Sequence, residues 1–180
     1  QAAFTDYGQY LDSLEMTATI RGFEPLYIQR IAQLTNKSNQ FNLTTLRCSE
    51  DDIRAMAADA DALCLCGKLV DKFGDNGIVT VVAGKRQGDL LDLTLWLMSC
   101  RVLKRGMEDA MMDTLMAQAA AAGVKTVVGH YYPTAKNAMV RDFYAQFGFA
   151  KTAEDAEGNT EWRLEVSGYA PKHPHMKIER

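Results

Sequence analysis

Apolar positions in this chain follow two periods, one typical of strands and one typical of helices. Alternating or continuous apolar runs predict strands at residues 16–20, 62–70, 78–83, 90–98, 124–129, 149–152 and 161–166. Apolar residues three and four apart predict helices that begin near Pro25, at Ser49, at Gly106 and at Thr134. The order β-α-α-β-β-β-α-β-α-β-β predicts one mixed α/β domain, with hairpins early and crossover helices late.

The run Leu90–Met98 is the predicted central strand. Strict alternation would place its leucines, Leu91, Leu93, Leu95 and Leu97, together on one face. The opposite face would carry Asp92, Thr94, Trp96 and Met98. We expect Cys100 to continue this second, more polar face.

The two ends of the chain differ from the middle. Residues 1–14 are polar and weakly periodic, so we expect a lead-in from a preceding segment, followed by a domain over 15–168. Residues 169–180 are interrupted by proline and predict a disordered tail. We do not expect its His173 and His175 to bind a metal.

Composition narrows the possible functions. The 180 residues are 47% hydrophobic and 24% charged, as in ordinary globular proteins. The net charge is −3 without a basic stripe, which argues against non-specific nucleic-acid binding. No apolar run has the length of a membrane span and no signal peptide is visible, so we expect no membrane association and a cytoplasmic protein.

The four cysteines do not form a disulfide framework. Cys64 and Cys66 lie two apart on a predicted strand, where they share a face but make a poor disulfide pair. We therefore expect free thiols in a reducing compartment. The pair Asp59 and Asp61 lacks the surroundings of a magnesium site, so no metal is expected.

The strongest local motif is Asn137-x6-Tyr144-x3-Gly148-Phe149, which follows a strand. It resembles the closing segment of the GNAT acyltransferase fold, a mixed sheet flanked by helices. The resemblance implies that Asn137 lies near a pantetheine arm and that Tyr144 protonates the departing thiolate. Two turns of helix would place both residues on one side, and a phenol stays protonated near neutral pH. The alternative is that Tyr144 is a core aromatic residue.

The connector that leads into the third predicted helix is the second motif. The GNAT pattern Q/R-x-x-G-x-G/A, whose amides hold the diphosphate of coenzyme A, would place Leu103, Gly106 and Glu108 at its defined positions. The resemblance implies cofactor binding by the connector and the asparagine, namely Met98, Arg101, Lys104, Arg105, Gly106 and Asn137. A carboxylate at Glu108 disfavours coenzyme A, although it could equally be a favourable first-turn residue of the helix.

Four longer blocks resemble the C-terminal half of FkbH-like proteins. They are RIAQLTNKSNQFNLTT (30–45), FGDNG (73–77), LWLMSCRVLKRGME (95–108) and HYYPTAKNAMVRDFYAQFGF (130–149), and LDSLEM (11–16) matches the preceding junction. The resemblance implies a partner domain of the haloacid-dehalogenase type, whose Asp-x-Asp-x-Thr motif this chain lacks. It also implies loading of a glyceryl unit onto the phosphopantetheine arm of an acyl carrier protein in polyketide-type biosynthesis.

Three sets of residues are candidates for this chemistry. Cys100, beside Arg101 and before a helix, could hold the glyceryl group as a thioester, or could be a buried structural thiol. His130 could be its base, or could be hydrogen-bonded in place. The amides and hydroxyls of Asn39, Gln40, Asn42 and Thr44 could recognise a hydroxylated acyl group, or could bond their own backbone.

Three functions follow from these residues. The first is glyceryl loading, with Cys100, His130 and Tyr144 as catalytic residues. The second is a non-catalytic docking module, in which Arg101, Lys104 and Arg105 form a basic rim for an acidic carrier. The third is an ordinary acetyl-CoA-dependent N-acetyltransferase, which Glu108 disfavours.

Overall fold

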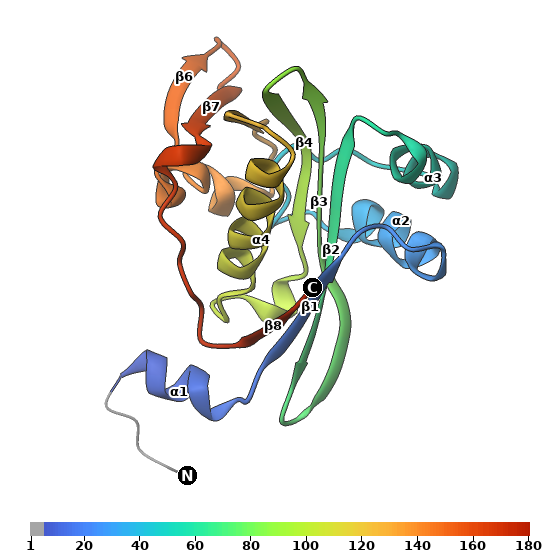
Figure 1. The fold of residues 1–180 in the computed structure, drawn as a ribbon, viewed down its shortest axis with the longest axis vertical. Helices are drawn as coiled ribbons and strands as arrows, with labels where there is room; N and C mark the ends of the chain where they lie inside the picture. Colours follow the sequence, from blue (N-terminus) through green and yellow to red (C-terminus); the bar gives the residue numbers. More distant parts are fainter. Residues whose placement is uncertain (1–5) are drawn as a thin grey trace.

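A computed structural model describes residues 6–180, and one eight-stranded sheet runs through it (Figure 1). The strands are β1 (Thr17–Arg21), β2 (Ala62–Asp71), β3 (Gly74–Gln87), β4 (Leu90–Met98), β5 (Thr126–Tyr131), β6 (Ala150–Glu154), β7 (Thr160–Glu165) and β8 (Lys177–Glu179). Their spatial order is β6-β7-β5-β4-β3-β2-β1-β8, antiparallel except for the parallel pairs β4–β5 and β1–β8. The mixed sheet confirms the predicted fold class.

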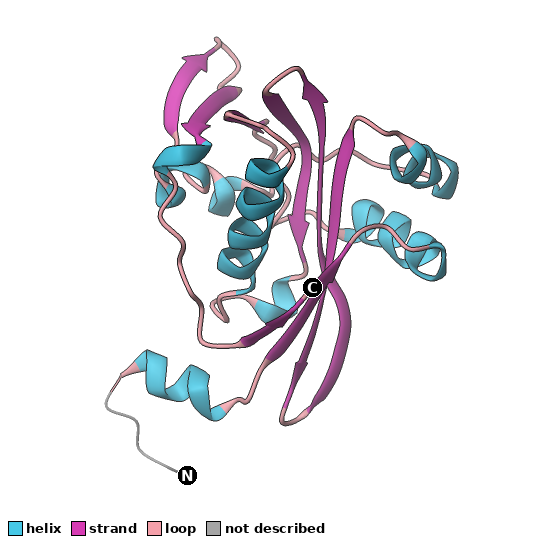
Figure 2. Cartoon of the chain, in the orientation of Figure 1, coloured by secondary structure: helices cyan, strands magenta, loops and turns pink. Residues whose placement is uncertain are grey.

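Helices cover both faces of this sheet (Figure 2). They are α1 (Tyr7–Ser13), α2 (Ile28–Lys37), α3 (Glu50–Ala58) and α4 (Met107–Ala121). Helix α4 packs on one face, and α2 and α3 pack on the other (Figure 1). Helix α3 begins as predicted: the Ser49 hydroxyl accepts from the Asp52 amide, and the Asp52 carboxylate accepts from the Ser49 amide.

A bulge in β4 overturns the predicted arrangement of the central strand. Ala83 of β3 pairs with Leu95 and the next residue pairs with Leu93, so Thr94 is an extra residue in the ladder. The alternation reverses at this point. The leucines before the bulge share the α4 face with Trp96 and Met98, whereas Leu95 and Leu97 join the core under α2 and α3. The predicted polar face that continued to Cys100 is therefore wrong, because Trp96 and Met98 are buried core residues.

The predicted helix over residues 134–146 is also wrong. The chain instead makes two short 3₁₀ turns, η3 (Ala138–Val140) and η4 (Tyr144–Phe147). The Asn137 carboxamide oxygen accepts from the Thr134 amide at 2.8 Å and from the Tyr131 hydroxyl at 3.3 Å. Such side-chain bonds to the main chain compete with the regular hydrogen bonds of a helix, here at the point where the helix was predicted to begin. The turns let Phe143, Tyr144 and Phe147 all enter the core.

The C-terminal segment is ordered, contrary to the prediction of a disordered tail. It passes along α4 and below the start of that helix before it ends in β8 (Figure 1). The Asp113 carboxylate on α4 accepts from the Tyr169 hydroxyl at 2.5 Å and from the Lys172 and His173 amides at 2.9 and 3.0 Å. At the other end, α1 covers residues 7–13 of the expected lead-in, whose residues 1–5 lie outside the described part.

The close packing of Tyr144 on Gly129 gives the first testable prediction. A Cβ atom at Gly129 would lie 2.6 Å from Cε1 of the Tyr144 ring, which Trp96 and Phe149 hold from other sides. We expect Gly129→Ala to lower the free energy of unfolding by about 2–3 kcal/mol, because the ring has no space to move. Denaturant unfolding measures this change. Gly22→Ala is the control, since its Cβ would meet nothing closer than 3.8 Å; equal losses in both variants would contradict the prediction.

Candidate functional site

A cavity of about 770 Å³ lies where β4 ends and the chain turns toward α4. Helix α2 forms one wall, and the segment that follows it forms a second. The lining residues are Arg30, Leu34, Lys37, Ser38, Asn39, Gln40, Met98, Ser99, Cys100, Arg101 and Lys136. Five of the predicted site residues therefore meet here, namely Asn39, Gln40, Met98, Cys100 and Arg101.

This cavity, which we call the basic cavity, is lined by cations without a balancing acid. Its four charged lining residues are Arg30, Lys37, Arg101 and Lys136, and no Asp or Glu is among the lining residues. Burial, together with the positive charge of Arg101, lowers the pKa of Arg30. Such a concentration of like charge attracts an anionic ligand or an acidic partner.

Cys100 places a thiol on this cavity. It is the first residue of the 3₁₀ turn η2 (Cys100–Val102), and its Sγ donates to the Gln40 carboxamide oxygen at 3.3 Å. Cys100 is exposed, unlike the other cysteines. This thiol is therefore accessible to a ligand in the basic cavity.

The other three thiols are poor nucleophiles by comparison. All four cysteines are free, but Cys48 and Cys66 are buried and Cys64 is half-buried. Burial raises the pKa of Cys64 to about 11 and that of Cys66 to about 12, and it also raises the pKa of Cys48. Cys100 is therefore the thiol best suited to covalent chemistry.

The groove between β4 and β5 is filled by the chain itself. These strands pair only where Leu90–Asp92 meet residues 126–128, and beyond that point they diverge. Residues 41–44, here called the insert, lie in the gap. The Leu43 amide donates to the Trp96 carbonyl and the Met98 amide donates to the Phe41 carbonyl, both at 3.0 Å. The insert thus forms hydrogen bonds with the main-chain groups of β4 along the edge where β4 diverges from β5.

The insert also bonds to the loop that follows β5 and makes a side-chain bond to β4. The Tyr132 amide donates to the Leu43 carbonyl at 2.9 Å, and the Thr44 hydroxyl donates to the Thr94 carbonyl at 2.7 Å. Asn137, completely buried, donates through its amide to the carbonyls of Asn42 and Tyr132, each at 2.9 Å. Asn137 therefore fastens the insert between the two strands.

The four predicted substrate-binding residues are consequently divided. Asn39 and Gln40 line the basic cavity, where Asn39 accepts from Arg47 and Gln40 from Cys100. Asn42 is completely buried and donates to the Ser38 carbonyl at 3.1 Å, and Thr44 is bonded to β4.

The three predicted catalytic residues do not meet. His130 Nε2 lies 2.5 Å from the Asp92 carboxylate near the start of β4. Met98 lies six positions after Asp92 along the strand, roughly 20 Å at the usual rise per residue. Tyr144 is buried on the α4 side, where burial and the charge of Asp92 raise the pKa of its phenol. Neither residue reaches Cys100.

The residues of the predicted cofactor connector are mostly engaged with the rest of the chain. Arg105 pairs with Asp71 at 3.0 Å, and the Lys104 carbonyl accepts from the Tyr7 hydroxyl. Gly106 caps α4 in a left-handed conformation. Of the three residues in the predicted basic rim, Arg101 lines the basic cavity.

Sequence reasoning missed Arg30, Lys37 and Lys136. The first two are seven apart on α2, and this spacing places them on one face of a helix. That spacing was the available signal in the sequence. Lys136 lies far away along the chain and joins the site only through the fold.

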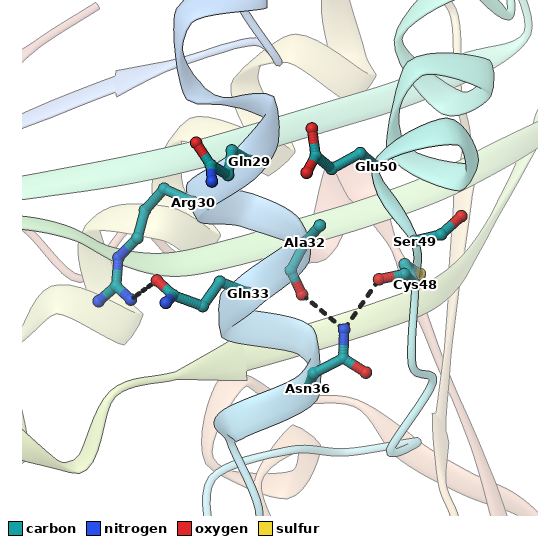
Figure 3. A pocket seen from close by; sticks show the side chains of 8 residues that line it. All are labelled: Gln29, Arg30, Ala32, Gln33, Asn36, Cys48, Ser49 and Glu50. Atoms are coloured by element: carbon teal, nitrogen blue, oxygen red, sulfur yellow. Dashed lines mark hydrogen bonds between the residues drawn. The ribbon is translucent and has the colours of Figure 1, made fainter.

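A second cavity of about 470 Å³ lies between α2 and the start of α3 (Figure 3). Its polar groups are largely bonded to one another: Arg30 donates to Gln33, and Asn36 donates to the Ala32 and Cys48 carbonyls. Its thiol, Cys48, is buried. The basic cavity is the better candidate because it exposes a nucleophile.

Within residues 6–180, no group of three or more His, Cys, Asp or Glu side chains is arranged to hold a metal ion. No helix in that part is long and apolar enough to cross a membrane.

Comparisons with known proteins identify the fold. No family model and no curated protein matches the sequence. Among solved structures, the ribosomal-protein-S18-alanine N-acetyltransferase from Escherichia coli superposes with a TM-score of 0.63 at 15% identity, over 86% of this chain and 97% of that one. Ard1 from Thermoplasma volcanium gives 0.63 at 18%, over 83% and 97%. Spermidine N-acetyltransferase from Vibrio cholerae, solved with CoA and spermine, gives 0.61 at 10%, over 83% and 96%.

These similarities define a class by structure. The chain has the mixed α/β fold of GNAT acyltransferases, as the Asn137–Phe149 motif predicted. Identities this low show the fold alone, so they do not identify the acyl group or its acceptor.

Proposed function

We propose that this domain is a thiol-dependent acyltransferase of the FkbH-like type, which passes a glyceryl unit through Cys100 to an acyl carrier protein. The observation that carries the proposal is an exposed thiol in a cavity lined by four cations and no acid. The sequence blocks that resemble FkbH-like proteins supply the identity of the acyl unit and of the carrier.

The proposed reaction is a pair of thioester exchanges. The Cys100 sulfur attacks the carbonyl carbon of a glyceryl thioester, the carbon–sulfur bond to the donor breaks, and the Cys100 proton ends on the released thiol. The carrier's phosphopantetheine thiol then attacks the glyceryl-Cys100 thioester in the same way and restores the Cys100 thiol. Each step exchanges one thioester for another, so no oxidant or metal is required. A haloacid-dehalogenase-like partner domain would supply the three-carbon group.

The test is a search for the acyl-enzyme. The protein is incubated with a glyceryl thioester of N-acetylcysteamine, and intact mass and peptide mapping locate any added glyceryl group. We expect one group on the peptide that contains Cys100, and its loss when a phosphopantetheine-bearing acyl carrier is added. An unmodified protein, or modification spread over Cys48 and Cys64, would overturn the proposal.

The cation-lined cavity also favours a second candidate, a docking module that positions the carrier without covalent chemistry. The carrier is acidic, and positive charge at the cavity would attract it in either case. A protein that binds the carrier but forms no glyceryl adduct would support this alternative.

Both candidates predict a strong dependence of carrier binding on the cavity's charge. We expect the double variant Arg30→Glu/Arg101→Glu to raise the Kd for the carrier at least about tenfold at low salt, because two attractive charges become repulsive. Titration calorimetry at two salt concentrations measures the change. Lys125→Glu/Lys151→Glu is the matched control, since it changes the net charge equally with exposed residues outside the cavity. Equal Kd values for the two variants would exclude the basic cavity as the docking site.

A further inference from the structure

The fold implies a cofactor, acyl-CoA, and its fit to this chain can be tested on the residues present. The Vibrio cholerae structure with the same fold was solved with CoA. An extended amide chain such as pantetheine would find hydrogen bonds along the diverging edges of β4 and β5. A diphosphate would need free amides and no negative charge at the start of α4.

The groove offers no such edge. The Trp96 and Thr94 carbonyls and the Met98 amide are bonded to the insert, and the Tyr132 amide beyond β5 is bonded to it as well. The insert is itself fastened by Asn137, which is completely buried. A pantetheine chain would have to displace residues 41–44 before it could pair with β4.

The start of α4 is closed by a different part of the chain. A Cβ atom on Gly106 would lie 3.1 Å from Cβ of Pro174, so the C-terminal segment lies directly against this turn. Glu108, in the first turn of α4, has a buried carboxylate oxygen without a hydrogen-bond partner among residues 6–180. Its burial also raises the pKa of this carboxyl. Neither the space beside Pro174 nor the buried side chain of Glu108 suits a diphosphate at this turn.

We infer that residues 41–44 and the segment around Pro174 are the chain's own occupants of the two places where acyl-CoA would bind, so that this domain does not use acyl-CoA. The groove in which this fold would hold the cofactor is filled by residues 41–44, which lie beside β4 as an extra extended segment. This inference does not depend on the proposed role of Cys100, because the groove is filled whether or not that thiol carries an acyl group.

The inference is tested by titrating the wild-type protein with coenzyme A, followed by calorimetry and by amide hydrogen exchange. We expect no saturable binding up to millimolar coenzyme A, and slow exchange of the Leu43 and Met98 amides with and without it. Micromolar binding that accelerates exchange at both amides would overturn the inference, because it would show the insert leaving the groove.

A third outcome is equally decisive. Binding that leaves both amides protected and disappears in Arg30→Glu/Arg101→Glu would assign coenzyme A to the basic cavity through its phosphates, and would support a closed groove. Binding that survives this double change and slows exchange at the Gly106 and Met107 amides would place coenzyme A at the start of α4 and would overturn the inference there.

Discussion

A Cys100→Ala variant is expected to form no glyceryl thioester and to lose transfer to the carrier by on the order of 100-fold or more. The physical reason is that the proposed route divides one transfer into two exchanges through this sulfur. Cys100 is exposed and, among residues 6–180, donates only to Gln40, so alanine should leave the fold intact. Intact mass measures the adduct, and gel-shifted or mass-resolved carrier measures the transfer.

Two controls make this result specific. Cys64→Ala removes a half-buried thiol whose pKa burial raises to about 11, and it should leave adduct and transfer unchanged. Gln40→Ala removes the hydrogen-bond acceptor of Cys100 but keeps the sulfur, so adduct formation should continue at an altered rate. Transfer that survives in Cys100→Ala would remove this residue from the mechanism and leave the docking function.

Replacing Asn137 by alanine should lower the free energy of unfolding by about 3–5 kcal/mol. The side chain is completely buried and satisfies the carbonyls of Asn42 and Tyr132 and the amide of Thr134. The bond to Asn42 is buried and those to Tyr132 and Thr134 are partly buried, and a buried main-chain group left without a partner costs about 1–3 kcal/mol. Urea unfolding measures the total, and faster hydrogen exchange at Leu43 should accompany it because the insert loses its anchor.

Asn36→Ala is the matched control for this variant. The Asn36 amide also donates to two main-chain carbonyls, those of Ala32 and Cys48, both at 2.9 Å (Figure 3). Asn36 is exposed, however, so water can replace these bonds, and we expect a loss of about 1 kcal/mol or less. Similar losses in the two variants would show that Asn137 is not the anchor of the insert.

Local patterns were sufficient for most of the fold. The capping box at Ser49, the helix from Met107 and the strand Leu90–Met98 all depend on neighbours within a few residues, and the structure confirms them. The Asn137–Phe149 motif identified the fold class even though its predicted helix is wrong. The fold-class prediction is correct because it depends on the order of helices and strands. The conformation of residues 134–146 depends instead on individual side-chain hydrogen bonds.

The prediction of which residues share each face of β4 is wrong because of a bulge that the sequence of β4 alone does not reveal. Thr94 is an extra residue only relative to β3, so the bulge is a property of the pair of strands. It reversed the positions of Trp96 and Met98 and thus removed the polar face that led to Cys100. Two interpretations of Cys100 were open, and the structure contradicts that of a buried thiol, because the 3₁₀ turn at Cys100 lies beyond the strand.

The candidate site could be predicted only in part because it is assembled from distant segments. Gln40 and Cys100 were singled out separately, and the fold places them 3.3 Å apart. Arg30 and Lys37 share a helix face by their spacing, but nothing in the sequence shows what that face borders, and Lys136 lacks any local feature that marks it as a site residue. These cations matter because they line one cavity that no Asp or Glu lines, and only the folded structure shows which residues share a cavity.

The parallel pairing of β8 with β1 has a consequence for how the protein is made. Thr17 pairs with Lys177 and Thr19 with Glu179, so the outer edge of β1 is covered by residues that are synthesised long after β1 itself. Until then the nascent domain carries an open strand edge, which is a template for association with other chains. Chains interrupted before residue 177 should therefore aggregate more readily than chains that include β8, because the edge of β1 then stays open.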